Sequence, residues 1–351
     1  MRWLVVHPGP AWSVADVFEG WREALTDLGE HVNAYNLGNR LTFYDTALQE
    51  IGHPGHDGVV QLRKAMTQEQ AVEAAVNGLK SACYQFLPDV VLVVSYFFVN
   101  AGLLDLLRMR GHRVVLLHTE EPYQHDTQLA LAAHADVNLL NDPANLDAYR
   151  ALGPAAYVPH CYRPTVHRPG PPDPDLACDL AFVGTGFPSR IAFLEAMDLD
   201  GLDVLLAGQW QLLGPGSPLR KFLAHDADQC LDNLQTVRAY QSAKAGLNLY
   251  RREADRPELA AGYAVGPREV EMAATGLFFL RDPRPEGDEL FPMLPTFDGP
   301  DDAAEQLRWS LAHDDQRHEA AAKAREAVTD RTFATAAARL LELLDRQPAT
   351  P

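Results

Sequence analysis

Two short runs of continuous apolar residues constrain the fold of this chain most. Residues 89–95 read DVVLVVS and residues 113–118 read RVVLLH, with a helical pattern over residues 101–110 between them. Strands that are apolar throughout are typical of parallel sheets that helices cover on both faces. The order strand, helix, strand therefore predicts an α/β fold built on parallel strands.

The same alternation is expected on both sides of a proline-rich segment. A first strand at residues 2–7 precedes a helix, for which Ser13 and Asp16 have the spacing of a capping box. The segment RPTVHRPGPPDP, residues 163–174, is too rich in proline for a helix or a central strand. Beyond it, strands are expected at residues 179–183 and 202–207.

This organisation predicts two Rossmann-like domains that face each other across a ligand cleft. The expected bounds are an N-terminal domain at 1–162, a proline-rich hinge at 163–177 and a C-terminal domain at 178–331. Residues 332–351 are expected to form a helix and tail, and the C-terminal helices to cross back onto the first domain.

The composition excludes several classes of protein. A formal net charge of −18 disfavours a protein that binds nucleic acid or an anionic membrane mainly through charge. No run approaches the roughly 20 apolar residues of a membrane helix. The apolar run at the start of the sequence is too short for a signal peptide. The four cysteines show no C-x-x-C spacing, so we expect unpaired thiols, no structural zinc and a cytoplasmic protein.

The stretch VGPREVEMAATGLFFL, residues 265–280, predicts a loop, a short helix and a buried strand. A helix start offers free N–H groups and a partial positive charge, to which Arg268 adds a cation. Glu271 lies one turn further along the same face and could accept hydrogen bonds from both hydroxyls of a ribose. The pair therefore suits a nucleoside diphosphate, although an i,i+3 salt bridge on a solvated helix would give the same pattern.

Five segments occur in an order that is typical of one known family. They are CDLAFVGTGFPSR (178–190), VLLAGQW (204–210), YQSAKAGLNLY (240–250), PREVEMAATG (267–276) and a helical C-terminal pattern from Asp298 onward. With these segments the chain resembles the GT-B glycosyltransferases, and within them the glycosyltransferase group 1 proteins of the spore-maturation CgeB type.

The resemblance implies transfer of a sugar from a nucleotide diphosphate sugar, with a UDP-sugar as first choice, to a hydroxyl acceptor. It implies that Arg268 and Glu271 hold the diphosphate and the ribose, and that Arg190 suits a phosphate contact. Further donor contacts are expected from Asn248 and from the turn Gly184, Thr185 and Gly186. Both have simpler explanations, because glycines shape tight turns without a ligand and a strand-end Asn often satisfies a turn. Neither a bound cofactor nor a metal ion is expected.

The acceptor hydroxyl needs a base or a polar anchor in the first domain. The best candidates are His118, Glu120 and Glu121, at the carboxyl end of the strand at residues 113–118. Two adjacent carboxylates could raise the pKa of one of them toward a useful value. The alternative is a polar loop that leads into the next helix, and His7 is a weaker candidate at the end of the first strand.

One departure from the family leaves the stereochemistry open. Many retaining members carry a glutamate eight residues before the ribose glutamate, where this chain has Tyr263. A nucleotide-sugar epimerase on the same fold and a catalytically silent nucleotide-sugar-binding module remain alternatives. The acceptor and the oligomeric state are left open by the sequence.

Overall fold

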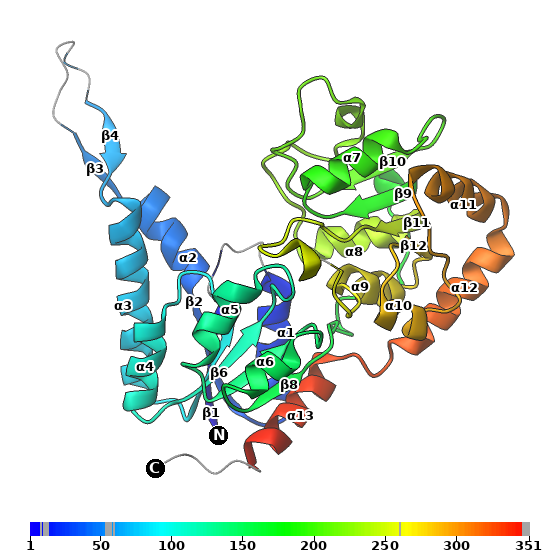
Figure 1. Ribbon diagram of the computed structural model, residues 1–351. Helices are drawn as coiled ribbons and strands as arrows, with labels where there is room; N and C mark the ends of the chain where they lie inside the picture. The colour runs from blue at the N-terminus through cyan, green and yellow to red at the C-terminus, as the bar shows by residue number, and fades with distance from the viewer. Residues whose placement is uncertain (8, 10–13, 53–57, 59, 260, 346–351) are drawn as a thin grey trace.

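Two parallel β-sheets form the two halves of the chain (Figure 1). The computed structural model describes residues 1–7, 9, 14–52, 58, 60–259 and 261–345. The first sheet has the order β2-β1-β5-β6-β7-β8 and the second the order β10-β9-β11-β12. Every pairing in both sheets is parallel, which confirms the predicted pair of Rossmann-like units.

The first sheet contains six strands within residues 2–157. They are β1 (Arg2–His7), β2 (His31–Asn36), β5 (Val90–Val94), β6 (Arg113–His118), β7 (Val137–Leu140) and β8 (Ala155–Tyr157). Its helices are α1 (Ala15–Asp27), α3 (Gln68–Phe86), α4 (Ala101–Met109), α5 (His125–Ala132) and α6 (Leu146–Arg150). Of the predicted capping box, Ser13 lies outside the described residues, and α1 begins directly after Val14.

Side chains of each strand alternate between two cores, one on each face of the sheet. In β1, Trp3 and Val5 pack against α1, whereas Leu4 and Val6 pack against α3 and α4. These side chains are fully buried, and each contributes roughly 1.5–3 kcal/mol through removal of apolar surface from water. Burial on both faces explains why these strands read as continuous apolar runs.

The second sheet contains β9 (Cys178–Val183), β10 (Val204–Ala207), β11 (Ala243–Asn248) and β12 (Phe279–Arg281). Its helices are α7 (Pro188–Ala196), α8 (Asn233–Ser242), α9 (Pro267–Thr275), α10 (Pro285–Leu290), α11 (Pro300–Ala312) and α12 (Asp314–Ala327). β11 pairs with β9 from Ala243 onward and ends at Asn248. Leu249 and Tyr250 therefore belong to the loop that follows β11.

The C-terminal helix α13 (Phe333–Asp345) returns to the first domain, as predicted (Figure 1). Phe333 packs edge-on against Trp21 of α1, with ring centroids 6.3 Å apart. A Cβ at Gly20 would lie 2.2 Å from the ring of Phe333, so only glycine permits this close approach. None of the described helices is both long and apolar enough to cross a membrane.

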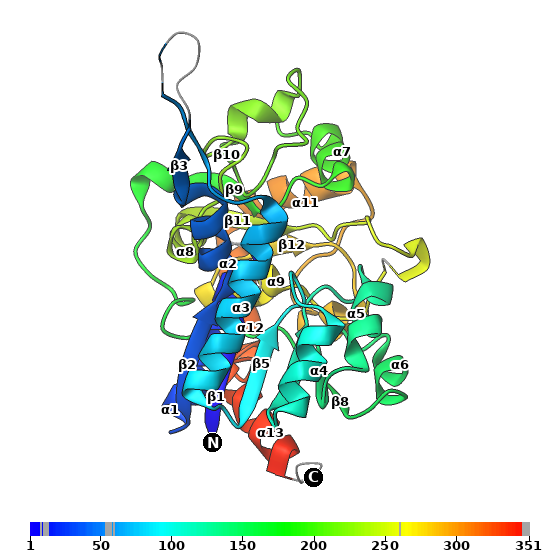
Figure 2. The same cartoon turned by 90° about the vertical axis from the view of Figure 1, so that its left-hand side faces the viewer.

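An insertion between β2 and α3 has no counterpart in the sequence prediction. It comprises α2 (Leu37–Thr42), a π-helical turn (Phe43–Ala47) and the antiparallel strands β3 (Gln49–Ile51) and β4 (Leu62–Lys64). Figures 1 and 2 show β3 and β4 projecting from the first domain beyond the end of α3. Strands of three residues are too short to give a recognisable period in the sequence.

Candidate functional site

A cleft of about 550 Å³ lies between the carboxyl ends of the two sheets. From the first domain, the start of α1 and the loops after β5, β6, β7 and β8 line it; from the second, the ends of β9 and β11 and the start of α9 do so. This position is the usual one for ligands of open α/β sheets. The predicted site residues that line the cleft are Glu120, Glu121, Gly184, Thr185, Arg190, Asn248, Arg268 and Glu271.

Arg190, on α7, is a partly buried cation at the cleft wall. Its Nε donates to the carbonyl of Leu249 (2.8 Å) and its Nη1 to that of Thr185 (3.0 Å). These carbonyls orient the guanidinium but carry no full negative charge. Among the described residues no carboxylate forms an ion pair with Arg190, and burial lowers its pKa to about 10. A partly buried charge that has no carboxylate counterion in the described part of the chain is suited to an anionic ligand.

The turn before α7 serves two purposes. Gly184 and Thr185 line the cleft, whereas Gly186 does not. A Cβ at Gly186 would lie 2.5 Å from the indole of Trp210, so this glycine permits close packing inside the second domain. The structure thus corrects the expected position of Gly186, which packs against Trp210 behind the cleft wall.

Helix α9 brings Arg268 and Glu271 to the cleft from the second domain. They form an ion pair of 2.6 Å, so the i,i+3 salt bridge exists, but it borders the cleft and the glutamate is buried. Asn248 lies at the end of β11 beside this helix, and its buried Nδ2 has no hydrogen-bond partner. An unpaired buried amide is costly unless a ligand or a water molecule satisfies it.

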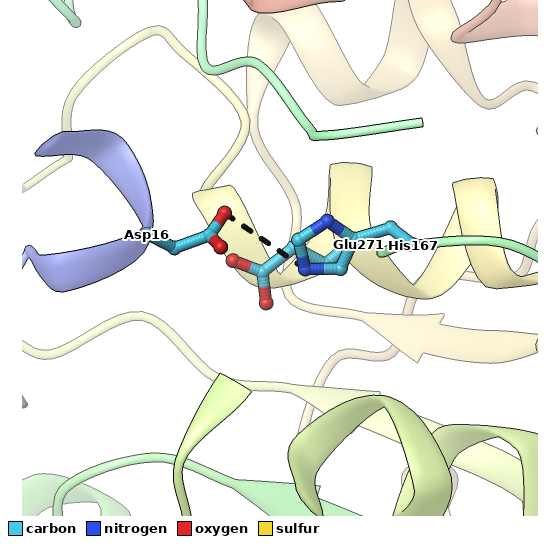
Figure 3. Close-up of side chains that lie close together, drawn as sticks. All are labelled: Asp16, His167 and Glu271. Carbon is cyan, nitrogen blue, oxygen red and sulfur yellow. Dashed lines mark ion pairs between the residues drawn. The ribbon is translucent and has the colours of Figure 1, made fainter. Parts of the chain in front are cut away.

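Glu271 also belongs to a buried cluster that the sequence did not predict (Figure 3). Asp16 of α1 and His167 of the linker face it, and the ligating atoms of all three residues lie within 4.8 Å of one another. The cluster has the residue types of a metal site. However, Nδ1 of His167 accepts the backbone N–H of Arg163 (3.2 Å), so in the neutral ring Nε2 carries the proton. Nε2 is the atom turned toward Asp16, at 3.9 Å, and a protonated nitrogen cannot bind a metal.

Two arginines already balance the carboxylates of this cluster. Arg163 donates to Asp16 (2.9 Å), and Arg268 is paired with Glu271. Asn233, the first residue of α8, also donates to Asp16 (3.1 Å). Asp16 thus connects the first domain to the linker and to the second domain, and burial raises its pKa.

His118 does not line the cleft, contrary to expectation. Its ring is buried and packs on Tyr149, with centroids 4.7 Å apart, and its Nε2 lies 2.8 Å from Oδ1 of Asn138. Burial lowers its pKa to about 4, so the ring is neutral near pH 7. The strand continues through His118, whose side chain therefore points to one face of the sheet and not beyond its end.

Glu120 and Glu121 have different surroundings although they are adjacent. Glu120 crosses the cleft and pairs with Arg251 of the second domain at 2.8 Å; burial raises its pKa, although Arg251 opposes this shift. The carboxylate of Glu121 is held inside the first domain by Tyr149, His125 and Asn145. Only Glu120 has a carboxylate that a movement of the domains could free.

Several residues of the cleft were missed by the sequence analysis. They are Asp16, Tyr123, Asp142, His160, Arg251 and Arg284. Asp142 and His160 follow β7 and β8, so the strand-end rule that found Glu120 could have found them too. Arg251 lies over the ring of Tyr123 (4.2 Å) and Arg284 over that of Tyr250 (3.8 Å), and no local motif marks either arginine.

Comparisons with known proteins agree with this architecture. A family model described as "Glycosyl transferase-like" matches residues 190–345, whereas no curated protein sequence matches the chain. The structure of trehalose-6-phosphate synthase OtsA has a TM-score of 0.68 at 11% identity and covers 100% of both chains. An alpha-glucosyltransferase in complex with UDP and a 13-mer DNA containing an HMU base has a TM-score of 0.63 at 12% identity, covering 98% of this chain and 99% of that one.

A third similar structure is described as a "putative UDP-N-acetylglucosamine 2-epimerase from Listeria monocytogenes". Its TM-score is 0.59 at 14% identity, and the match covers 98% of this chain and 95% of the other. At such identities these likenesses show the fold, and the family model covers less than half of the chain. The chain therefore has the GT-B fold, and its residues 190–345 match the glycosyl transferase-like family model.

Proposed function

We propose that this chain transfers a sugar from a nucleotide diphosphate sugar to a hydroxyl group in the cleft between its domains. The observation that carries the proposal is Arg190, a partly buried cation at the cleft wall without a carboxylate partner among the described residues. The leaving group of such a reaction is a nucleoside diphosphate, whose charge must be neutralised as the glycosidic bond breaks. Arg190 supplies that charge beside the start of α9.

The remaining donor contacts follow from this placement. The positive end of α9 and Arg268 complete a cationic wall for the diphosphate. Glu271 accepts hydrogen bonds from the ribose hydroxyls, and the unpaired Nδ2 of Asn248 donates to the sugar or the base. The donor nucleotide is UDP in this proposal; the similar alpha-glucosyltransferase was solved with UDP, which supports that choice.

Glu120 acts as the base toward the acceptor hydroxyl in this proposal. Of the three predicted catalytic residues, Glu120 is the one whose side chain faces the cleft and is not held inside its own domain. Its raised pKa makes it a better proton acceptor than an exposed glutamate. His118 and Glu121 support the loop that carries it.

The reaction proceeds without a metal ion in this proposal. Arg190, Arg268 and the start of α9 provide the positive charge that a metal would otherwise supply. The cluster of Asp16, His167 and Glu271 offers a protonated nitrogen and two carboxylates that arginines already pair, so its chemistry does not suit a metal ion.

An epimerase is the second candidate, favoured by the similar epimerase structure. An epimerase would alter the nucleotide sugar itself and would need no acceptor hydroxyl. Incubation with the nucleotide sugar alone, followed by analysis of the sugar, separates the two activities. We expect only slow release of the nucleoside diphosphate by transfer to water, and recovery of an isomeric nucleotide sugar would favour the epimerase.

The donor site is tested by thermal-shift measurements with UDP, GDP, ADP, dTDP and CDP and their sugars. A nucleotide at 100 times its dissociation constant stabilises the folded protein by about 2.7 kcal/mol. We expect the wild type to respond to UDP and its sugars, and Arg190→Ala to lose the response. Arg308→Ala, which removes a partly exposed arginine of α11, is the matched control and should respond like the wild type.

Two further results complete this test. Arg268→Ala should also weaken the response if the diphosphate lies at the start of α9. A folded wild type that responds to none of these nucleotides would exclude the proposed donor site and leave a binding or structural role for the chain.

A further inference from the structure

Asp142 of the first domain is bound almost entirely by groups of the second domain. Its side chain, just beyond β7, is 3% exposed. Oδ2 accepts the backbone N–H of Tyr263 (2.8 Å) and of Ala264 (2.9 Å) and lies 3.4 Å from Nη1 of Arg284. Oδ1 accepts the N–H of Ala144 (2.8 Å), which fixes the orientation of the carboxylate within its own domain.

The segment that Asp142 holds leads directly into α9. Four consecutive amides, those of residues 263 to 266, donate to buried carboxylates. After the two bound by Asp142, Val265 donates to Glu286 (2.8 Å) and Gly266 to Glu269 (2.7 Å). Glu286 and Glu269 belong to the second domain, so Asp142 is the carboxylate of this series that comes from the other side of the cleft.

The same contacts reach the wall of the cleft. Arg284, itself buried, lies over the ring of Tyr250 at 3.8 Å, and the hydroxyl of Tyr250 donates to Glu269 beneath the start of α9. A displacement of Asp142 would therefore act on both the backbone before α9 and the side chains below it. Shifts of about 1 Å in a binding group are enough to change affinity or rate by as much as a hundredfold.

We propose that Asp142 is a positioning residue for the donor site. The first domain, through Asp142, sets the position of the segment 263–266 and hence of the helix start that receives the diphosphate. Donor affinity then depends on docking of the two domains, although the donor contacts themselves belong to the second domain. This inference rests on the proposed function for the identity of the ligand, but the contact itself is independent of it.

Hydrogen exchange of the ligand-free protein tests the contact first. In Asp142→Ala we expect faster exchange of the amides in residues 261–267, because two of them lose their acceptor. Asp147→Ala is the matched control: it removes an exposed aspartate of α6 in the same domain and should leave exchange in this segment unchanged. Unchanged exchange in Asp142→Ala would overturn the contact.

Titration with UDP tests the positioning role. We expect Asp142→Ala to bind UDP at least about tenfold more weakly than the wild type does. Asp147→Ala should bind UDP like the wild type, and Arg190 is present in both variants. If exchange rises and affinity is unchanged, the contact is structural and the positioning role is overturned. A wild type that binds no nucleoside diphosphate would overturn the donor site and with it this role, whereas the exchange result would still decide whether the contact forms.

One variant keeps the test decisive if Asp142→Ala fails to fold. The single change leaves the buried Arg284 without this carboxylate, which is the costly way to break an ion pair. Asp142→Ala combined with Arg284→Gln removes both charges. The amides of residues 263 and 264 still lack their acceptor in this double variant. The same faster exchange over residues 261–267 and the same loss of UDP affinity are expected from it, and their absence counts against the proposal as before.

Discussion

Glu120→Gln is expected to slow sugar transfer by about 100- to 10,000-fold while the fold and the nucleotide affinity are retained, because a general base contributes a factor of this size. The glutamine has nearly the same shape but cannot accept the proton of the acceptor hydroxyl. The measurement is the single-turnover release of UDP from a UDP-sugar, with water or a hydroxyl compound as acceptor. An equal rate in wild type and variant would show that Glu120 is not the base of the reaction.

The pH dependence gives an independent readout of the same role. A base works when deprotonated, so the wild-type rate should fall as the pH decreases through the pKa of Glu120. Burial raises that pKa above the ordinary value of 4.5, and Arg251 only partly opposes the shift. The acid limb of the kcat/KM profile should therefore lie above pH 4.5, and Glu120→Gln should abolish it.

Arg251→Gln is the control that separates a base from an interdomain ion pair. It breaks the same 2.8 Å contact but leaves the carboxylate of Glu120 in the cleft. We expect Arg251→Gln to retain the acid limb and to lose much less activity than Glu120→Gln. Equal losses in both variants would mean that the ion pair, and not proton transfer, is what the reaction needs.

The sequence predicted the secondary structure well where one physical signal dominated. The strands expected at residues 2–7 and 113–118 have the observed bounds. Both are long or strongly apolar, so neighbouring structure does not override them. The projecting strands β3 and β4 lack such a signal, since each has three residues and their side chains are exposed.

The strand-end rule located the loop after β6 at the cleft but not the direction of each side chain. His118 is still within the strand, so it alternates with Leu117 and points to a face of the sheet. Glu120 lies beyond the last paired residue and reaches the cleft. The rule therefore applies to residues after the end of a strand, and a strand that is one residue longer than assumed moves a candidate from the cleft into the core.

Contacts between the domains could not be predicted from local sequence. Asp142 and Arg284 are 142 positions apart, and Asp16 and Asn233 are 217 positions apart. No periodicity or spacing links such positions, and only the packing of the two domains brings them together. The cleft residues of the second domain were easier to predict, because Arg268 and Glu271 share one helix and Gly184 and Thr185 share one turn.

Glu121→Ala is expected to lower the free energy of unfolding by about 3–5 kcal/mol, whereas Glu120→Gln is expected to retain the fold. The side chain of Glu121 is fully buried, and its carboxylate accepts from the hydroxyl of Tyr149, from His125 (2.8 Å) and from Asn145 (2.8 Å). The alanine would leave three polar groups without an acceptor in the interior, and each costs about 1–3 kcal/mol. Urea unfolding of wild type and variant measures the difference.

An exposed carboxylate at the start of α5 is the control for this loss of stability. Asp126→Ala removes an exposed partner of Arg256 at 3.0 Å and should cost no more than about 1 kcal/mol, because water screens such pairs. If Glu121→Ala is as stable as Asp126→Ala but no longer transfers sugar, Glu121 acts in the reaction and not in the fold. The expected result is a large loss of stability, with UDP binding retained at temperatures where the variant is folded. It would establish that the adjacent glutamates have different roles. Glu121 fixes the loop after β6, and Glu120 reaches the cleft from this loop.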